Sequence, residues 1–277
     1  MSECNHDCGS CKDSGCDKRS FIETPKSTTK IKKIIGVMSG KGGVGKSLVT
    51  SMLAVAANKR GLKTAVMDAD VLGPSIPKSF GLGEKERMQG SDEGLFPSIT
   101  KGGIKVASIN LLLEQETMPV VWRGPVVSGV VKQFYTDVLW EDLDVMFIDM
   151  PPGTGDVPLT VFQSIPITGA VIVTTPQDLV KMVVEKSYNM AAMMNIPVVG
   201  VIENMSYLKC PRCSEVVYPF GKGKTKEVAD KFGVEFLGNI PISEKTRELV
   251  DAGKVEQLDV GFLDSAVDKI LNFEGAK

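Results

Sequence analysis

The ten residues MSGKGGVGKS, positions 38–47, contain four glycines and two lysines between an apolar run and a segment with helical spacing. Gly40 to Ser47 satisfy the spacing G-x-x-x-x-G-K-[ST] of a phosphate-binding loop. Small residues let successive backbone N–H groups turn toward phosphate oxygens, and the N-terminus of the next helix adds partial positive charge. The stretch therefore predicts a nucleotide site between a strand and a helix, whereas the alternative is a glycine-rich turn without a ligand.

Two side chains of this loop have chemistry suited to a bound nucleotide. Lys46 can reach the β- and γ-phosphates, and the Ser47 hydroxyl can bind Mg²⁺. Lys41 adds a second cation that the phosphate-loop spacing does not require. The residues predicted to contact the nucleotide are Gly40, Lys41, Gly42, Gly43, Val44, Gly45, Lys46 and Ser47.

Apolar runs alternate with helical patterns along most of the chain. The predicted strands are 33–39, 64–70, 104–110, 143–150, 169–176, 196–204 and 234–241, and the predicted helices are 47–61, 126–139, 178–194, 223–232, 243–251 and 263–273. Nearly continuous apolar strands separated by helices indicate a mostly parallel sheet that helices cover on both faces. The fold is therefore predicted to be an α/β fold of the P-loop NTPase kind.

Two segments depart from this alternation. Residues 1–30 contain little that can be buried, and we predict that they form a flexible, cysteine-rich segment ahead of a globular domain at 31–277. Within that domain, LKCPRCSEVVYPFG interrupts the alternation near 208–220 and is predicted to form a loop or a small ribbon.

The composition limits the partners of the chain. Its 277 residues are 43% hydrophobic and carry a net charge of −2, which argues against a nucleic-acid coat or a strongly basic membrane surface. It contains no apolar run of about 18 residues, the length that spans a bilayer. The first residues lack the apolar centre of a secretory signal. We therefore expect a cytoplasmic protein with no membrane and no nucleic-acid partner.

Six cysteines fall into two clusters, which are Cys4, Cys8, Cys11 and Cys16 at the front and Cys210 and Cys213 in CPRC. Clustered thiols without an export signal favour metal or iron–sulfur ligation over disulfides. CPRC provides half of a four-sulfur site, and a symmetric dimer would complete it with the same two residues of a second chain. The alternative is a zinc site in which CPRC joins the front CxxC.

Polar residues follow several of the predicted strands. Asp68 and Asp70 end one strand, Asp149 ends another, and Asn204 ends a third. Ligands bind at the carboxyl ends of the strands in parallel sheets. Each of these residues alone can also be an ordinary helix cap or turn residue. Together with the phosphate loop, they indicate a nucleotide site at one edge of the sheet.

The loop resembles the deviant Walker A loop, K-G-G-x-G-K-S, of the family that includes nitrogenase iron protein, MinD and ParA. This resemblance implies that Lys41 reaches the nucleotide of a partner subunit when two subunits close face to face. It also implies that Asp149 holds Mg²⁺ through water, that Asp68 lies near the metal, and that Asp70 orients the attacking water. The implied catalytic residues are Lys41, Lys46 and Asp70.

The resemblance extends to the adenine side of the site. Asn204, in VIENMS, matches the position of a base-reading asparagine, and Pro241, in GNIPIS, matches a second segment beside the base. Glycines in PPGTGD resemble a switch loop that responds to the γ-phosphate.

A closer resemblance covers residues 31–260. MSGKGGVGKS, MDADVLGPSIP, WRGP, IDMPPGTGD, IVTTPQ, ENMSY and CPRC occur in the order found in Mrp/ApbC-type iron–sulfur cluster carrier ATPases. The resemblance implies a homodimer that hydrolyses ATP with Mg²⁺, binds a labile [4Fe–4S] cluster through Cys210 and Cys213, and delivers it to apo iron–sulfur proteins. Some relatives carry a second cluster at the N-terminus. The spacing of Cys4, Cys8, Cys11 and Cys16 is similar but more compact. His6 is either an alternative ligand or a histidine without a role in the site.

Two other functions remain open at this point. A MinD- or ParA-like ATPase that acts through its location would need an amphipathic membrane helix or a basic DNA-binding face, and neither is visible in the sequence. A structural zinc protein would use the cysteines without iron. Iron and zinc analysis of anaerobically purified protein distinguishes these alternatives.

Overall fold

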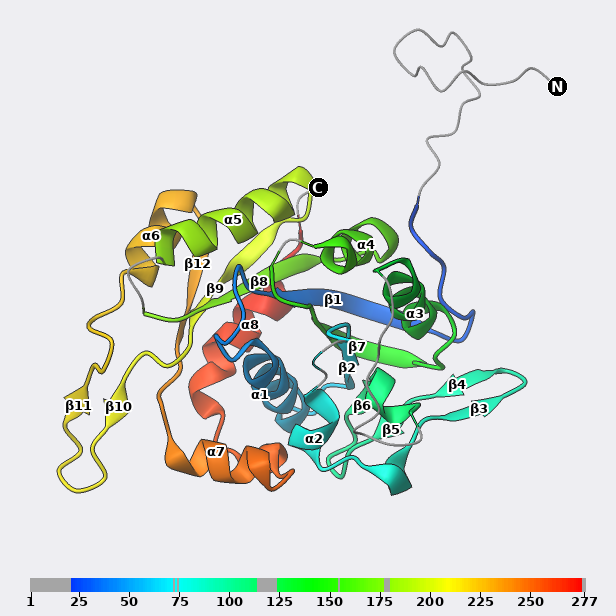
Figure 1. The fold of residues 1–277 in the computed structure, drawn as a ribbon, viewed down its shortest axis with the longest axis horizontal. Coiled ribbons are helices and arrows are strands. Elements are labelled where there is room, and N and C mark those ends of the chain that lie inside the picture. Colours follow the sequence, from blue (N-terminus) through cyan, green and yellow to red (C-terminus); the bar gives the residue numbers. More distant parts are fainter. Residues whose placement is uncertain are drawn as a thin grey trace, which may run out of the picture.

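The computed structural model describes residues 21–275 apart from positions 72, 74, 114–123, 154 and 177–179. Its centre is an eight-stranded sheet (Figure 1). The strand order is β12 (Glu235–Asn239), β9 (Val198–Glu203), β8 (Gly169–Thr174), β1 (Lys30–Met38), β7 (Asp142–Asp149), β2 (Thr64–Asp68), β6 (Lys105–Ala107) and β5 (Ser98–Ile99). Every pairing is parallel except that of β5 with β6. The predicted α/β class is confirmed.

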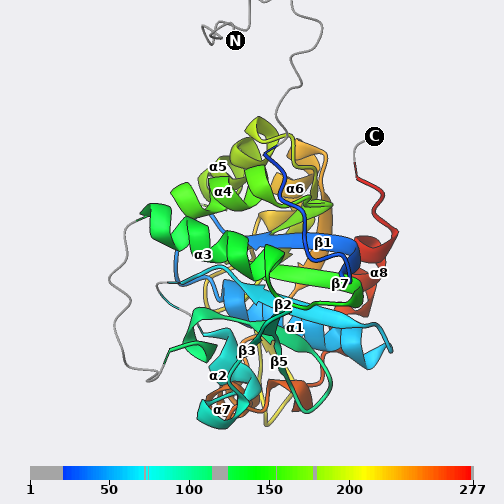
Figure 2. The same ribbon diagram turned by 90° about the vertical axis from the view of Figure 1, so that its right-hand side faces the viewer.

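Helices cover both faces of this sheet (Figures 1 and 2). One face carries α1 (Lys46–Lys59) and α8 (Asp264–Asn272), and the other carries α3 (Gly124–Thr136), α4 (Asp156–Ser164), α5 (Val180–Met193) and α6 (Thr225–Phe232). Two further helices, α2 (Ile76–Phe80) and α7 (Glu244–Asp251), contact each other beside α1. Because both faces are covered, the residues of β2 and β8 are all buried.

The core is formed by β-branched and aromatic residues of the central strands together with the inner face of α1. Ile35, Phe147 and Leu53 are fully buried there, and each such side chain contributes about 1.5–3 kcal/mol through its removal from water. This rigid core fixes the carboxyl ends of β1, β2, β7 and β9 relative to one another. The loops that follow these strand ends therefore start from fixed positions.

Several short elements were not predicted. They are α2, α4, the ribbon β3 (Gln89–Ser91) with β4 (Gly94–Phe96), the edge strand β5, and short 3₁₀ turns. A proline lies in the first turn of both α2 and α4, at Pro77 and Pro158, and each helix is shorter than ten residues, so neither shows a long helical period. Most of the β3–β4 ribbon is exposed, so it has no buried alternation to detect.

The segment predicted to be flexible, residues 1–30, contacts the domain in the part that the structure describes, from residue 21 onward. The backbone N–H of Glu23 donates to the carbonyl of Ser164 at 2.8 Å, and its carboxylate pairs with Lys132 at 3.2 Å. The first strand begins at Lys30, three residues earlier than predicted. Among the described residues, no helix is long and apolar enough to cross a membrane.

Candidate functional site

The glycine-rich loop connects the carboxyl end of β1 to the N-terminus of α1. Gly43 and Gly45 have φ angles of 79° and 77°, in the left-handed region that favours glycine. A Cβ on Gly45 would lie 2.3 Å from Asn204 Nδ2, whereas one on Gly43 would meet nothing within 4 Å. The loop therefore needs glycine at position 45 for backbone conformation and for space, and it stays open at position 43, where a phosphate can approach.

Lys46 is the first residue of α1 and lies under the loop. Its side chain is 6% exposed, and its Nζ is 2.7 Å from Asp149 Oδ1 at the end of β7. Asp149 is fully buried and also accepts hydrogen bonds from the hydroxyls of Ser47 (2.5 Å) and Thr50 (2.9 Å). The structure thus brings together the three residues that the sequence assigned to phosphate and metal binding, which are Lys46, Ser47 and Asp149.

Two more carboxylates lie at the carboxyl end of β2, one on its last residue and one two residues beyond it. Asp68 is buried, and its oxygens accept hydrogen bonds from the backbone N–H of Asp70 at 3.1 Å and from the hydroxyl of Ser108 at 3.0 Å. Asp70 Oδ2 lies 3.7 Å from Lys46 Nζ. A cluster of three aspartates around one lysine results, and it has the excess of negative charge that a divalent cation would balance.

Burial and mutual repulsion govern the protonation of these carboxylates. Removal from water, followed by the charge of Asp149, raises the pKa of Asp68 well above its ordinary value of 3.8. Burial also raises the pKa of Asp70, although the charge of Lys46 opposes this shift. Without a bound cation, the cluster therefore disfavours full ionisation.

Lys41 is the second residue of the glycine-rich loop, directly after Gly40. Its backbone carbonyl accepts a hydrogen bond from the Ser39 hydroxyl at 2.9 Å, which fixes the start of the loop. The residue is partly exposed, next to the exposed Gly42 and Gly43. Lys46, by contrast, is directed into the protein. The two lysines of the loop thus differ in exposure to solvent, since Lys41 is partly exposed and Lys46 is buried.

The two residues assigned to the adenine side belong to neighbouring segments. Asn204 is buried directly after β9, and its Nδ2 donates to the carbonyl of Val44 at 2.9 Å. Pro241 follows β12, where the N–H of Ile240 donates to the carbonyl of Glu203 at 2.8 Å. The structure therefore places Asn204 against the phosphate loop. Pro241 follows Ile240, which is hydrogen-bonded to Glu203 at the end of β9.

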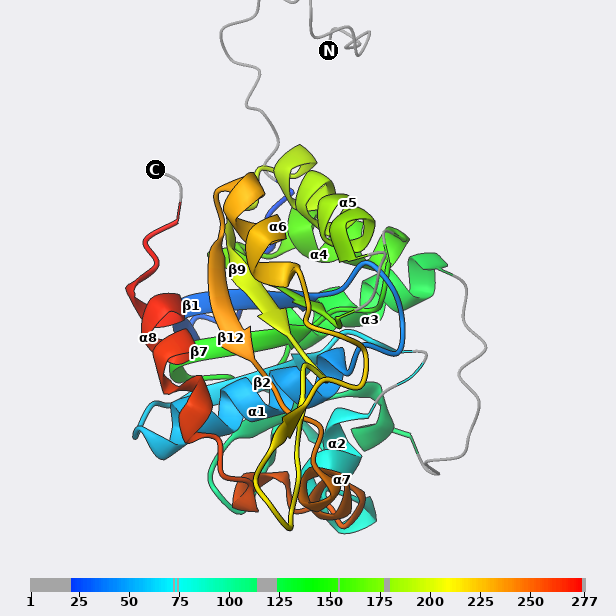
Figure 3. The ribbon, with the colours of Figure 1, turned by 90° about the vertical axis from the view of Figure 1, so that its left-hand side faces the viewer.

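Cys210 and Cys213 lie in the turn of a two-stranded ribbon, β10 (Leu208–Lys209) with β11 (Val216–Val217), which Figure 3 shows in yellow beyond the end of β9. The Cys210 N–H donates to the Glu215 carbonyl, and the Ser214 N–H donates to the Cys210 carbonyl. Both thiols are free; Cys213 is exposed and Cys210 partly so. Of the loop or small ribbon predicted near 208–220, the structure has the small ribbon.

Backbone geometry of the turn acts on one of these thiols. Hydrogen bonds from the backbone N–H groups of Cys213 and Arg212, together with the Cys213 thiol, lower the pKa of Cys210. A lowered pKa increases the thiolate population, and the thiolate is the form that binds metals. In the described part of one chain, no group of three or more cysteine, histidine, aspartate and glutamate side chains has the arrangement of a complete metal site.

The front cysteines Cys4, Cys8, Cys11 and Cys16, together with His6, lie outside the described residues.

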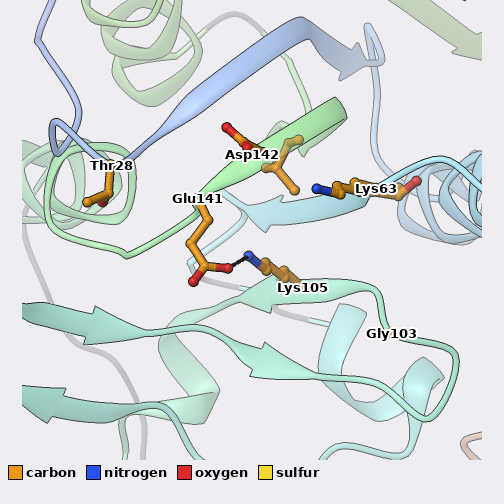
Figure 4. A pocket seen from close by; sticks show the side chains of 8 residues that line it. Thr28, Lys63, Gly103, Lys105, Glu141 and Asp142 are labelled. Atoms are coloured by element: carbon orange, nitrogen blue, oxygen red, sulfur yellow. Dashed lines mark hydrogen bonds and ion pairs between the residues drawn. The ribbon is translucent and has the colours of Figure 1, made fainter.

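A separate surface cavity of about 510 Å³ lies at the opposite edge of the sheet, where β2, β6 and β7 begin (Figure 4). Lys105 and Glu141 form an ion pair of 2.6 Å at its margin, and Lys105 also donates to the carbonyl of Trp140 at 2.7 Å. None of the predicted site residues lines this cavity. The candidate nucleotide site is therefore the loop at the carboxyl edge, and this cavity is distinct from it.

Sequence reasoning missed three residues that the structure adds to the neighbourhood of the site. Thr50 binds Asp149, Ser108 binds Asp68, and Glu203 lies next to Asn204. Thr50 follows Ser47 by three residues and so lies on the same face of α1. Ser108 and Glu203 stand at the carboxyl ends of strands, the signal by which the aspartates were found. The same signal therefore also marks Ser108 and Glu203 as candidates for the site.

The fold and the site together define a class of protein. A glycine loop joins the first strand to a helix at the carboxyl edge of a parallel sheet, and a lysine, a hydroxyl and a strand-end aspartate converge beneath it. This arrangement is that of a P-loop NTPase.

Comparison with known proteins identifies the family. The ParA family profile described as NUBPL iron-transfer P-loop NTPase matches residues 30–272, and the chain belongs to that family. An iron-sulfur cluster carrier protein of Methanocaldococcus jannaschii is 49% identical over 261 residues, which are 91% of this chain and 90% of that protein. The carrier protein of Clostridium perfringens is 46% identical over 252 residues, 89% of this chain and 88% of the relative.

Solved structures agree with this assignment. A nucleotide-binding protein of Archaeoglobus fulgidus in complex with ADP has a TM-score of 0.76 and 48% sequence identity, over 84% of this chain and 91% of that one. The cell division ATPase MinD of Pyrococcus furiosus has a TM-score of 0.55 at 19% identity, over 87% of this chain and 97% of that one, and shows the shared fold alone. The predicted resemblance to iron–sulfur cluster carrier ATPases is confirmed at the level of the family.

Proposed function

We propose that this protein is an ATPase that carries a [4Fe–4S] cluster between two copies of the chain and delivers it to apo iron–sulfur proteins. The observation that carries the proposal is the pair Cys210 and Cys213, whose thiols lie in one ribbon turn beyond the end of β9. The two thiols are half of the set that a [4Fe–4S] cluster requires. A second copy supplies the other half by symmetry.

The chemistry of the ribbon turn fits this cargo. Iron–sulfur clusters are held by thiolates, and the backbone of the turn favours the thiolate form of Cys210. The ribbon surrounding the thiols is exposed, so a second chain and an acceptor protein can reach them. A site that is open to solvent on one chain and closed only by a second chain suits a cluster that must be released.

The phosphate loop fits MgATP. Its open glycines leave room for the phosphates, Lys46 would contact the β- and γ-phosphates, and Ser47 with Asp149 would hold Mg²⁺, with Asp68 close by. A bound Mg²⁺ supplies charge neutralisation on the transferred phosphoryl group. Asp70, which is partly exposed and 3.7 Å from Lys46 Nζ, would orient the attacking water. Asn204 and Pro241 would line the adenine side.

Lys41 supports a homodimer. Lys41 is partly exposed, whereas the Lys46 side chain is buried against Asp149. In a face-to-face dimer, Lys41 would contact the phosphates of the partner's nucleotide and stabilise the charge that develops there. The same closure would bring the two ribbons together. ATP binding and cluster binding would then share one assembled state.

The decisive experiment measures iron on the cysteine ribbon. The matched control is the full chain in which Cys4, Cys8, Cys11 and Cys16 are replaced by Ser, because only Cys210 and Cys213 then remain. Anaerobic reconstitution should load this control with about four iron ions per dimer, and the cluster should transfer to an apo-ferredoxin acceptor. Cys210→Ser in this background should lose iron, the dimer and transfer together.

Two results would contradict the proposal. One is retention and transfer of about four iron ions per dimer by the chain that lacks Cys210. The other is purification of the control with stoichiometric zinc and no capacity for iron, since that result identifies a structural zinc site. Separate loading of the wild-type chain shows whether the front cysteines hold a second cluster.

A further inference from the structure

Glu203, the last residue of β9, is a buried carboxylate that the nucleotide chemistry does not use. Its side chain is 3% exposed. It accepts a hydrogen bond from the Ser206 hydroxyl at 2.5 Å and another, shorter one from the Thr225 hydroxyl. None of the ion pairs of the described residues includes Glu203. A buried carboxylate held by two hydroxyls is costly to desolvate, so its partners are fixed closely in position.

The two hydroxyls belong to opposite ends of the cysteine ribbon. Ser206 lies two residues before β10, and Thr225 is the first residue of α6, after β11. Both are buried, whereas residues 208–224 between them are exposed except for the half-buried Cys210. Because the ribbon has so little buried surface of its own, its position depends on how its two ends are attached. Glu203 attaches both.

The returning end of the ribbon runs directly over this carboxylate. A Cβ added to Gly223 would lie 2.0 Å from Glu203 Oε2. No side chain can occupy that position without moving Glu203 or the ribbon. A third attachment, the hydrogen bond of 2.7 Å from the Ile242 N–H to the Tyr207 carbonyl, holds the outgoing end against the segment after β12.

The neighbouring residue connects the same strand end to the nucleotide loop. Asn204 donates to the carbonyl of Val44, and its Nδ2 fills the space where Gly45 would carry a Cβ. Two consecutive residues at the end of β9 therefore contact two different sites. Asn204 contacts the phosphate loop, and Glu203 contacts both ends of the ribbon that carries Cys210 and Cys213.

We propose that the Glu203–Asn204 pair couples the phosphate loop to the cysteine ribbon, with Glu203 acting as a positioning residue. This inference rests on the proposed function, for which it supplies the route between the two sites. Phosphates that enter the loop displace the Val44–Gly45 backbone, and Asn204 transmits this displacement to the end of β9. Since the interior is close-packed, Glu203 moves with it and shifts both ends of the ribbon. Nucleotide binding thereby changes the exposure and spacing of the two thiols.

The test uses metal-free protein and the thiols as reporters. In the full chain with the four front cysteines replaced by Ser, the rate at which Cys210 and Cys213 react with an aromatic disulfide is measured with and without MgADP. Variants Thr225→Val and Ser206→Ala each remove one hydroxyl from Glu203. The matched control is Thr29→Val, which removes a buried hydroxyl that has no hydrogen-bond partner among the described residues.

MgADP should change the thiol rate about fivefold or more in the background chain and in Thr29→Val, the lower range of a typical allosteric coupling. Each Glu203-partner variant should reduce that change to less than about twofold, while its ADP affinity stays within about twofold of the background. Ser206 and Thr225 hold opposite ends of the ribbon. If circular dichroism shows that one variant is unfolded, the other variant therefore still tests the coupling.

Two outcomes overturn the inference. One is a thiol rate that does not respond to MgADP in the background chain, and the other is a full response in Thr225→Val and Ser206→Ala. These outcomes are separable from failure of the proposed function, which is judged by iron loading. The background chain can fail to hold a cluster while both variants lose the response of the thiol rate to MgADP. That combination supports the coupling and contradicts the carrier function.

Discussion

Lys46 and Asp149 form a buried ion pair with 2.7 Å between Nζ and Oδ1. The carboxylate also accepts hydrogen bonds from Ser47 and Thr50, so its hydrogen-bond partners among the described residues lie in the first five residues of α1. In this arrangement the lysine balances the charge of the aspartate. A bound nucleotide would offer the same lysine phosphate oxygens instead. One residue would therefore serve both the stability of the free protein and the binding of its ligand.

Replacing Lys46 should affect both properties. Lys46→Ala leaves Asp149 buried without a cation, and loss of one member of a buried pair costs about 3–5 kcal/mol. The variant should therefore unfold at a lower temperature in the absence of nucleotide. It should also bind ATP weakly and lose ATP hydrolysis by about 100-fold or more, because a cation that stabilises the transferred phosphoryl group is missing.

A double variant separates these effects. Asp149→Asn removes the unpaired charge, so Lys46→Ala with Asp149→Asn should regain most of the thermal stability while hydrolysis remains absent. Equal stability of the single and double variants would show that the ion pair does not stabilise the free protein.

Asp70 should act on turnover more than on binding. It lies 3.7 Å from Lys46 Nζ and is partly exposed, and we propose that it orients the attacking water. Asp70→Ala should lower kcat by about 100-fold and leave ATP affinity within about threefold of the wild type. Lys46→Ala is the comparison, since it should weaken binding as well. The same loss of ATP affinity in both variants would reject this division of roles.

Gly43 and Gly45 provide a matched pair that tests the packing of the loop. Both have φ near +78°, at 79° and 77°, so Ala costs backbone strain of about 1 kcal/mol or more at either position. Only at Gly45 would the new Cβ also collide with Asn204. Gly45→Ala should therefore lower the unfolding temperature and ADP affinity more than Gly43→Ala. Calorimetric unfolding and ADP titration measure both, and identical effects would exclude the Asn204 contact as a constraint.

The long elements of the fold were predictable because each repeats one local signal. The apolar runs at 64–70 and 169–176 gave strands that begin at the predicted residues, and the helical spacing at 178–194 gave α5 within two residues at each end. The missed helix α4 begins after Gly155 and contains Pro158, and its buried positions depend on contact with α3. Elements stabilised by tertiary contacts leave no period in the sequence.

The residues of the site also fall into those marked by a local sequence signal and those that depend on tertiary contacts. Lys46, Ser47 and Asp149 were found because a local spacing and a strand end mark them, and the structure places them in contact. The hydrogen bond from Thr225 to Glu203, by contrast, joins residues 22 positions apart. A long-range pairing of this kind depends on how β9 and α6 pack. Nothing in the local sequence specifies it.

Asp144 should make stability depend on pH. The Lys32 side chain at 2.7 Å and then the Lys63 backbone N–H at 2.8 Å lower the pKa of Asp144. A carboxylate with a lowered folded-state pKa adds stability above its ordinary value of 3.8, and this stability is lost as the pH falls through the lower value. Asp144→Asn should lower the unfolding temperature only slightly at neutral pH, because water screens the ion pair with the exposed Lys32. The difference should vanish in acid, and an unchanged difference at low pH would contradict the assignment.

Lys41 should act on the nucleotide of the partner subunit. In a homodimer, Lys41→Ala removes both trans lysines, so it should slow hydrolysis about 100-fold with little effect on the stability of each chain. A mixed dimer separates cis from trans action. One chain carries Lys41→Ala, and the other carries Asp70→Ala, which disables its own site. If Lys41 acts in trans, the site of the Lys41→Ala chain still receives the lysine of its partner and hydrolyses ATP at the wild-type rate. Inactive mixed dimers alongside active wild-type dimers would show that the lysine serves its own chain.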